Sequence, residues 1–147
     1  MAVDPVSGSI VVVYTDQPGP NSVAEYVRCP PAFSGACASP QAINDVGDGQ
    51  RVFPAVAVDN LGIVHVSWYD SRNASSDPYS SQLDVYATFA LSVHKPFHAN
   101  ARVTPSTIDF DSRGFIGDYT GTAAGWGIAH PAWTNGYLQS SLLLASP

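Results

Sequence analysis

Residues 54–72 read Pro54-Ala55-Val56-Ala57-Val58-Asp59-Asn60-Leu61-Gly62-Ile63-Val64-His65-Val66-Ser67-Trp68-Tyr69-Asp70-Ser71-Arg72. Apolar side chains alternate on both sides of a short polar segment, a pattern typical of two antiparallel strands. The polar segment, residues 59–62, ends in Gly62, which adopts a positive φ at little cost and so favours a tight turn. The stretch therefore predicts a β-hairpin that closes on a polar segment, residues 70–72.

The same hairpin pattern occurs twice more in the chain. Residues 1–16 contain it with one extra residue in the turn, and residues 121–135 contain it again. Each copy has a glycine in the turn, an aromatic residue near the end of the second strand and a polar residue two positions later. In the three copies these residues are Gly8, Tyr14 and Asp16; Gly62, Trp68 and Asp70; and Gly127, Trp133 and Asn135. This internal repeat predicts an array of similar supersecondary units.

Further strands are predicted after each hairpin. A third strand is expected at residues 23–28, 83–92 and 137–146, and a fourth around residues 41–44 and 101–104. Both faces of the strand at residues 10–14 are apolar, as expected for a strand packed between two sheets. We therefore predict an all-β fold in a single domain, residues 1–147, with units at 1–52, 53–114 and 115–147, the last incomplete.

The composition excludes several classes of protein. Of 147 residues, 45% are hydrophobic and 12% charged, with 12 Gly and 12 Pro, which favours short strands and turns over surface helices. The net charge is −6 with six Lys and Arg, too few to neutralise a phosphate backbone, so no nucleic-acid partner is expected. No apolar run approaches the about 18 residues of a membrane helix, so no membrane partner is expected. Strand-like sequence directly follows Met1, so we expect no signal peptide in this chain.

Several segments together resemble the sialidase-like β-propellers, also called bacterial-neuraminidase-repeat proteins. They are residues 53–59, 62, 64–72 and 84–87, and Phe115-Ile116-Gly117-Asp118-Tyr119-Thr120-Gly121. The resemblance implies a propeller segment of about two and a half four-stranded antiparallel blades. Such a segment is a fragment of a longer chain, self-assembles with other copies into a ring, or stacks openly. Residues 92–97 occupy the place of the family's Asp box and keep its Ser and aromatic residue but lack its Asp and Gly.

The resemblance also implies a function. Family sialidases hold a substrate carboxylate with three Arg, use a Tyr nucleophile assisted by a Glu, and use an Asp as acid/base. This chain has no Arg-Ile-Pro motif, and Glu25 is its only Glu. We therefore predict a glycan-directed module that binds a glycan or anionic sugar or forms part of an exo-sialidase-type glycoside hydrolase. The alternative is a non-catalytic secreted scaffold or protein-interaction propeller. No cofactor is predicted, and whether the chain is an enzyme stays open.

The candidate site residues follow from the repeat and the resemblance. Asp118 and Tyr119 are the candidate catalytic pair, because Gly117 and Gly121 flank a strand expected to line the propeller channel. The alternative is that Tyr119 packs in the blade and Asp118 caps a turn. Arg72, Asp70 and Arg113 are candidate substrate-binding residues; the alternatives are a structural turn for the first two and a local ion pair for Arg113.

Cysteine and metal chemistry complete the predictions. Cys29 and Cys37 flank a loop with Pro-Pro and Gly that can fold back, so we predict a local disulfide between them; the alternative is two free thiols. A disulfide and the family imply an extracellular or periplasmic location. No metal site is predicted, because His65 and His130 lack a third ligand and residues 44–49, although rich in oxygen ligands, fail the EF-hand pattern. Asn73-Ala74-Ser75 matches a glycosylation sequon by pattern only.

Overall fold

The computed structural model describes residues 1–74, 81–110, 119–135 and 142–144. These residues form twelve strands and one short 3-10 helix, η1 (Pro31–Phe33), and they include no α-helix. The predicted site residues Arg113 and Asp118 lie outside the described residues.

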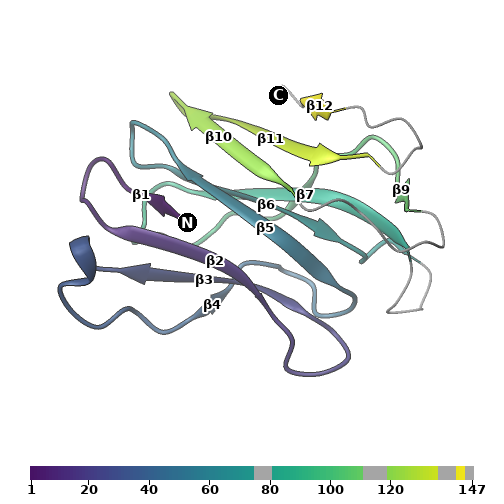
Figure 1. The fold of residues 1–147 in the computed structure, drawn as a ribbon, viewed down its shortest axis with the longest axis horizontal. Coiled ribbons are helices and arrows are strands. Elements are labelled where there is room, and N and C mark those ends of the chain that lie inside the picture. The colour runs from purple at the N-terminus through teal and green to yellow at the C-terminus, as the bar shows by residue number, and fades with distance from the viewer. Residues whose placement is uncertain (75–80, 111–118, 136–141, 145–147) are drawn as a thin grey trace.

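The strands form three antiparallel sheets (Figure 1). The first sheet has the order β1 (Ala2–Val3), β2 (Ile10–Asp16), β3 (Val23–Cys29) and β4 (Gln41–Ala42). The second has the order β5 (Arg51–Val58), β6 (Val64–Asp70), β7 (Gln82–Ala90) and β8 (Ala101–Arg102), and β9 (Ile108–Asp109) also pairs with β7. The third has the order β10 (Gly121–Gly125), β11 (Ile128–Thr134) and β12 (Leu142–Leu144). The prediction of an all-β antiparallel fold is therefore confirmed.

The three predicted hairpin turns have the expected backbone. Gly8, Gly62 and Gly127 adopt φ values of 73°, 83° and 83°, a region that L side chains rarely occupy. The aspartate at the start of two of these turns caps the loop. Asp59 Oδ1 accepts the backbone N–H groups of Leu61 and Ile63, both at 2.9 Å. Asp4 Oδ1 accepts the N–H of Val6 at 3.0 Å, so the turn chemistry repeats along the chain.

The hydrophobic core lies on both faces of the second sheet, because side chains alternate along β6. Val64, Val66 and Trp68 pack toward the first sheet in a cluster that also contains Val11, Ala24, Tyr26, Ile43, Tyr86, Ala90 and Val93. On the opposite face, Tyr69 packs with Leu83, Val85, Ile108, Phe110 and Trp133. Every residue of β6 is buried, which matches a central sheet packed between two others.

The three sheets follow one another in space in chain order, and a similar contact between turns joins each sheet to the next (Figure 1). β5 packs against β1 and β2 on one side and against β10 on the other. A Cβ at Gly62 would lie 3.4 Å from Asp4 Oδ1 of the preceding turn. One sheet further on, the N–H of Gly127 donates to Asp59 Oδ2 at 2.7 Å. The turn aspartate of each sheet therefore meets the turn glycine of the next.

Strand register defines two ends of this array. Arg51 pairs with Asp70, and Asp70 pairs with Asp84, so these residues share one end, here called the polar end. At the opposite end Val58 pairs with Val64 and Val64 with Ala90. The turns at residues 4–8, 59–62 and 125–127 lie there, and this end is here called the turn end.

The structure differs from the sequence prediction in several boundaries. β5 begins at Arg51, ahead of the predicted boundary between residues 52 and 53. The first strand of the third sheet begins at Gly121, so Tyr119 precedes it, and the strand expected between Gly117 and Gly121 is wrong over the described residues 119–120. Of the strand expected at residues 137–146, the described part is β12. No helix in the described part of the chain is long and apolar enough to cross a membrane.

Candidate functional site

Asp70 is buried at the polar end among positive groups. Its side chain has no solvent exposure. Oδ2 lies 3.3 Å from Arg51 Nε and accepts hydrogen bonds from Arg72 Nη2 at 2.7 Å and Trp68 Nε1 at 2.9 Å. Oδ1 accepts the N–H of Arg72 at 2.9 Å. This set of donors compensates the desolvation of a buried carboxylate.

Arg51 organises the loop at residues 46–49. Its Nη1 donates to the carbonyls of Gly47 at 3.1 Å and Gly49 at 2.9 Å, and its Nη2 donates to that of Val46 at 2.7 Å. Burial lowers the pKa of the guanidinium, and the charge of Asp70 opposes this effect. The oxygen-rich loop singled out in the sequence therefore wraps a guanidinium of the chain itself.

Arg72 links the second sheet to two loops. It donates from Nη1 to Asp45 Oδ1 at 2.6 Å and from Nη2 to Asn100 Oδ1 at 3.1 Å, and it lies 4.0 Å above the ring of Tyr86. Burial alone would lower the pKa of Arg72, but the hydrogen bonds and charges of Asp70 and Asp45 raise it above its ordinary value. Asp70 and Arg72 thus lie together and have partners inside the chain, an arrangement that agrees with the alternative of a structural turn.

Asp84 on β7 lies opposite Asp70, and its carboxylate has hydrogen-bond partners of its own. Its Oδ1 accepts from Arg102 Nη2 at 2.7 Å and from the Thr104 hydroxyl at 3.1 Å. Its Oδ2 accepts from Asn73 Nδ2 at 2.8 Å, the amide of the predicted sequon. Two facing buried carboxylates therefore each have their own cation and donors, which fixes the geometry of the polar end.

A β-bulge exposes an aromatic ring beside this cluster. The pairing of β5 with β6 shifts between Val52 and Ala55, and Phe53 inside the shift has φ 51°. Its side chain is 42% exposed, although it meets the ring of Tyr69 edge-on at 6.5 Å. Bulges and left-handed non-glycine residues concentrate at functional sites, where they re-aim side chains. Sequence reasoning missed Phe53; the signal was Pro54, since proline within a strand favours a bulge.

Tyr119 lies near this bulge. The hydroxyl of the adjacent Thr120 donates to the carbonyl of Phe53 at 2.8 Å, which ties the two segments together. Tyr119 itself is 84% exposed. The structure therefore presents an exposed Tyr and an exposed Phe from two neighbouring segments.

A Tyr–Glu pair on the first sheet was also not predicted. Tyr14 and Glu25 face each other across β2 and β3, and the Tyr14 hydroxyl donates to Glu25 Oε2 at 2.5 Å. This hydrogen bond raises the pKa of Tyr14 to about 12, with burial and the charge of Glu25 adding to the effect. Both residues lie in strands that the sequence predicts. Aligning these two strands as antiparallel partners would have placed Tyr14 opposite Glu25, because residues opposite each other share a face.

The histidines singled out in the sequence are not arranged as a metal centre. His65 Nε2 lies 3.4 Å from Asp59 Oδ2. Burial alone would raise the pKa of Asp59, but the N–H groups of Ile63, Gly127 and Leu61 lower it below its ordinary value. Among the described residues, no three His, Cys, Asp or Glu side chains gather where they could hold a metal ion.

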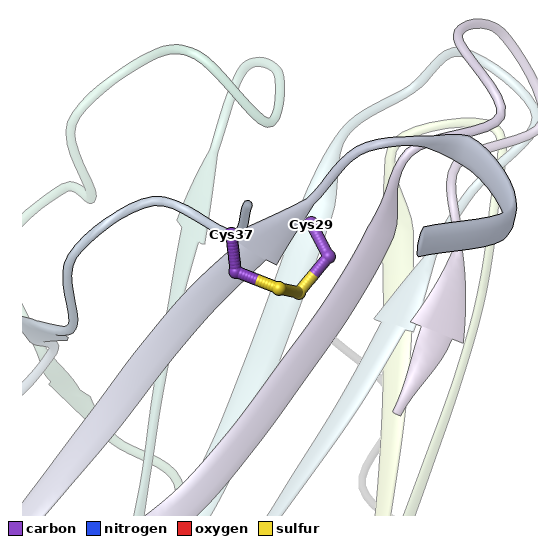
Figure 2. The surroundings of a disulfide bond; sticks show 2 residues. All are labelled: Cys29 and Cys37. Atoms are coloured by element: carbon purple, nitrogen blue, oxygen red, sulfur yellow. A yellow bond between two sulfur atoms is a disulfide. The ribbon is translucent and has the colours of Figure 1, made fainter. Parts of the chain in front are cut away.

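Cys29 and Cys37 form a disulfide, with an S–S distance of 2.00 Å (Figure 2). Cys29 ends β3, and the chain folds back through η1 to Cys37. The hydrogen bond from the N–H of Ala38 to the carbonyl of Arg28, at 2.8 Å, closes the same loop. The disulfide prediction is confirmed, and a disulfide is consistent with an oxidising, extracellular environment.

No family model, curated protein or solved structure matches the chain. The resemblance to sialidase-like propellers therefore rests on the sequence motifs.

Proposed function

We propose that the chain is a glycan-binding module built as a segment of a sialidase-like propeller. The repeated contact between the turn aspartate of one sheet and the turn glycine of the next supports the propeller arrangement, because blades in a propeller follow one another by a constant rotation. The proposed binding surface is the polar end, where Phe53 and Tyr119 are exposed.

The single observation that carries the glycan proposal is that Phe53 and Tyr119 are both exposed on two segments joined by a hydrogen bond. The left-handed backbone at Phe53 and the Thr120–Phe53 hydrogen bond hold the segments that carry the two rings. Aromatic rings offer flat apolar area against which the C–H face of a sugar packs, with polar groups beside them for the hydroxyls.

Binding without hydrolysis is favoured by how the arginines are used. Arg51 and Arg72 are paired with Asp70, and Arg102 is paired with Asp84. A guanidinium already engaged by a carboxylate is a poor receptor for the carboxylate of a substrate. These three arginines therefore serve the fold in the proposal.

A glycan array and a fluorogenic sialoside test the proposal together. We expect the chain to bind glycans and to release no fluorophore, and we expect Phe53→Ala or Tyr119→Ala to weaken binding. Phe33→Ala is the matched control, because Phe33 is 56% exposed but follows β3 at the turn end. Turnover that Tyr119→Phe abolishes would establish a hydrolase instead, and the absence of any glycan binding would refute the proposal.

A second candidate function, a protein-interaction scaffold, is favoured by the turn end. Val6, Leu61 and Trp126 are 70%, 54% and 79% exposed. They lie along adjacent turns, since the Trp126 N–H donates to Asn60 Oδ1 at 2.8 Å and a Cβ at Gly62 would lie 3.2 Å from Val6 Cγ2. Contiguous exposed apolar side chains mark interaction surfaces.

Light scattering of the chain and of the Trp126→Ser variant tests whether this surface joins copies of the chain. A multimer that the substitution dissociates supports self-assembly, and a monomer in both proteins excludes self-assembly.

A further inference from the structure

Among the residues that the structure describes, two basic side chains form no ion pair with a carboxylate. The sequence contains six Lys and Arg residues against a net charge of −6. Arg113 lies outside the described residues, and Arg51, Arg72 and Arg102 form ion pairs with aspartates. The remaining two, Arg28 and Lys95, make no ion pair with any described residue.

Arg28 and Lys95 line the same cleft. It has a volume of about 340 Å³ and lies between β3, β4 and the segment that joins them on one side and the loop that follows β7 on the other. Ser39 and Gln41 contribute from the first sheet's side and His94 from the loop, and none of the lining residues is acidic. The volume falls within the range of about 300–1,000 Å³ typical of small-ligand sites.

Both walls of the cleft are fixed. On one side the Cys29–Cys37 disulfide and the hydrogen bond from Ala38 N–H to the Arg28 carbonyl, 2.8 Å, hold residues 28 and 38 together. Across the cleft, the buried Tyr26 donates from its hydroxyl to the carbonyl of Val93 at 3.0 Å. A turn closed by Lys95 N–H on the Ser92 carbonyl, 3.1 Å, shapes the loop. A site with fixed walls loses little entropy when a ligand binds.

We propose that this cleft binds the anionic group of an acidic saccharide, a carboxylate or a sulfate ester on a single sugar ring. The Arg28 guanidinium offers a planar fork of N–H donors that matches such oxyanions, and the Lys95 ammonium adds a second positive charge. Ser39 and Gln41 supply hydroxyl and amide groups for the sugar hydroxyls. The cleft lies away from the polar end, so anion binding there does not depend on Phe53 or Tyr119, and only the choice of a saccharide as the carrier of the anion rests on the proposed function.

Isothermal titration calorimetry with three sugars tests the proposal. The probes are glucuronic acid, N-acetylglucosamine 6-sulfate and uncharged N-acetylglucosamine. We expect saturable binding of one or both acidic sugars, which also distinguishes a carboxylate from a sulfate ligand, and no comparable binding of the uncharged sugar. Added salt should weaken binding, because an exposed charge pair is screened within about 10 Å at 0.1 M ionic strength.

Substitutions in the cleft give the decisive comparison. Arg28→Gln and Lys95→Gln should each weaken the acidic sugar about tenfold, the effect expected from losing a hydrogen bond to a charged group. Lys95→Arg should restore binding. Lys95 lies in an exposed loop, so Lys95→Gln remains informative even if Arg28→Gln fails to fold.

Gln17→Glu is the charge-matched control, because it also lowers the net charge by one but lies at an exposed position outside the cleft. It should leave the affinity unchanged. Equal binding of charged and uncharged sugars, or an equal loss of affinity in Gln17→Glu and Lys95→Gln, would overturn the proposal, as would the absence of saturable binding by both acidic sugars.

Discussion

The charge balance at the polar end depends on individual side chains. Asp70 accepts hydrogen bonds from Trp68 and Arg72 and pairs with Arg51, and both Asp70 and Arg51 are fully buried. A buried ion pair contributes modestly as a whole, but removing one member leaves an uncompensated charge in a low-dielectric environment. Asp70 is therefore the position at which the second sheet is most sensitive to loss of charge.

Asp70→Asn should lower the free energy of unfolding by about 3–5 kcal/mol, because it leaves Arg51 buried without its counter-charge. Urea denaturation measures the loss. Asp16→Asn is the control at the corresponding position of the first hairpin, where the side chain is exposed, and should change stability by less than about 0.5 kcal/mol. Similar losses in the two variants would contradict the assigned role of Asp70.

Tyr14 should titrate well above an ordinary tyrosine. Its pKa is about 12 beside Glu25, compared with an ordinary value of 10.0. The neutral phenol is favoured in the folded chain, so its contribution to stability is complete below pH 10.0 and lost as the pH rises through about 12. In Glu25→Gln the pKa of Tyr14 should fall toward 10.0.

Ultraviolet absorbance at alkaline pH follows the Tyr14 titration, and its disappearance in Tyr14→Phe assigns it. An unchanged titration in Glu25→Gln would show that the cross-strand hydrogen bond does not control this phenol.

The hairpin turns are the elements that join one sheet to the next. The aspartate of a turn caps its own backbone, and Asp59 also accepts the N–H of Gly127 in the following turn. Asp59 therefore both closes its own hairpin and connects it to the next one. This dual use explains why turn glycines recur at one register in the sequence.

Gly62→Ala should destabilise the protein for two reasons. The backbone has φ 83°, and a Cβ would lie 3.2 Å from Val6 Cγ2 of the preceding turn. We expect a loss of at least about 1–2 kcal/mol, the cost of a side chain in the left-handed region. Urea denaturation is the measurement, and Gly125→Ala is the control, since nothing lies within 4 Å of its Cβ position. Equal stability of both variants would exclude the proposed turn-to-turn packing.

Over the whole molecule, buried tyrosine hydroxyls tie the sheets to one another. Tyr26 connects β3 to the loop after β7 through the carbonyl of Val93 at 3.0 Å. Tyr69 on β6 donates to the carbonyl of Thr134 at 2.8 Å and accepts its N–H at 2.9 Å. Each of these hydrogen bonds joins adjacent sheets.

Tyr69→Phe should therefore loosen the third sheet selectively. The substitution leaves two backbone groups of Thr134 without their partner, at a cost of about 1–3 kcal/mol. Hydrogen exchange should become faster in β11 and remain unchanged in β3. Tyr26→Phe is the reciprocal control and should affect the loop at residues 91–97 instead. Faster exchange throughout the chain in both variants would show that the hydroxyls do not act locally.

Much of the strand layout was predictable from the sequence because its determinants are local. The alternation in residues 54–72, the glycines at 8, 62 and 127, and the eight-residue spacing of the two cysteines act over short stretches of chain. Less was predictable about the sites. Arg28 and Lys95 share a cleft only because β3 and the loop after β7 pack together, and no local pattern records that contact.

The sequence alone determined the repeated hairpin and the antiparallel all-β class, because each follows from residues near one another in the chain. The tertiary structure decided that Arg51 is buried against Asp70 and that Arg28 and Lys95 line one cleft. The physical reason is that charge compensation and exposure depend on neighbours that only the packed sheets bring together.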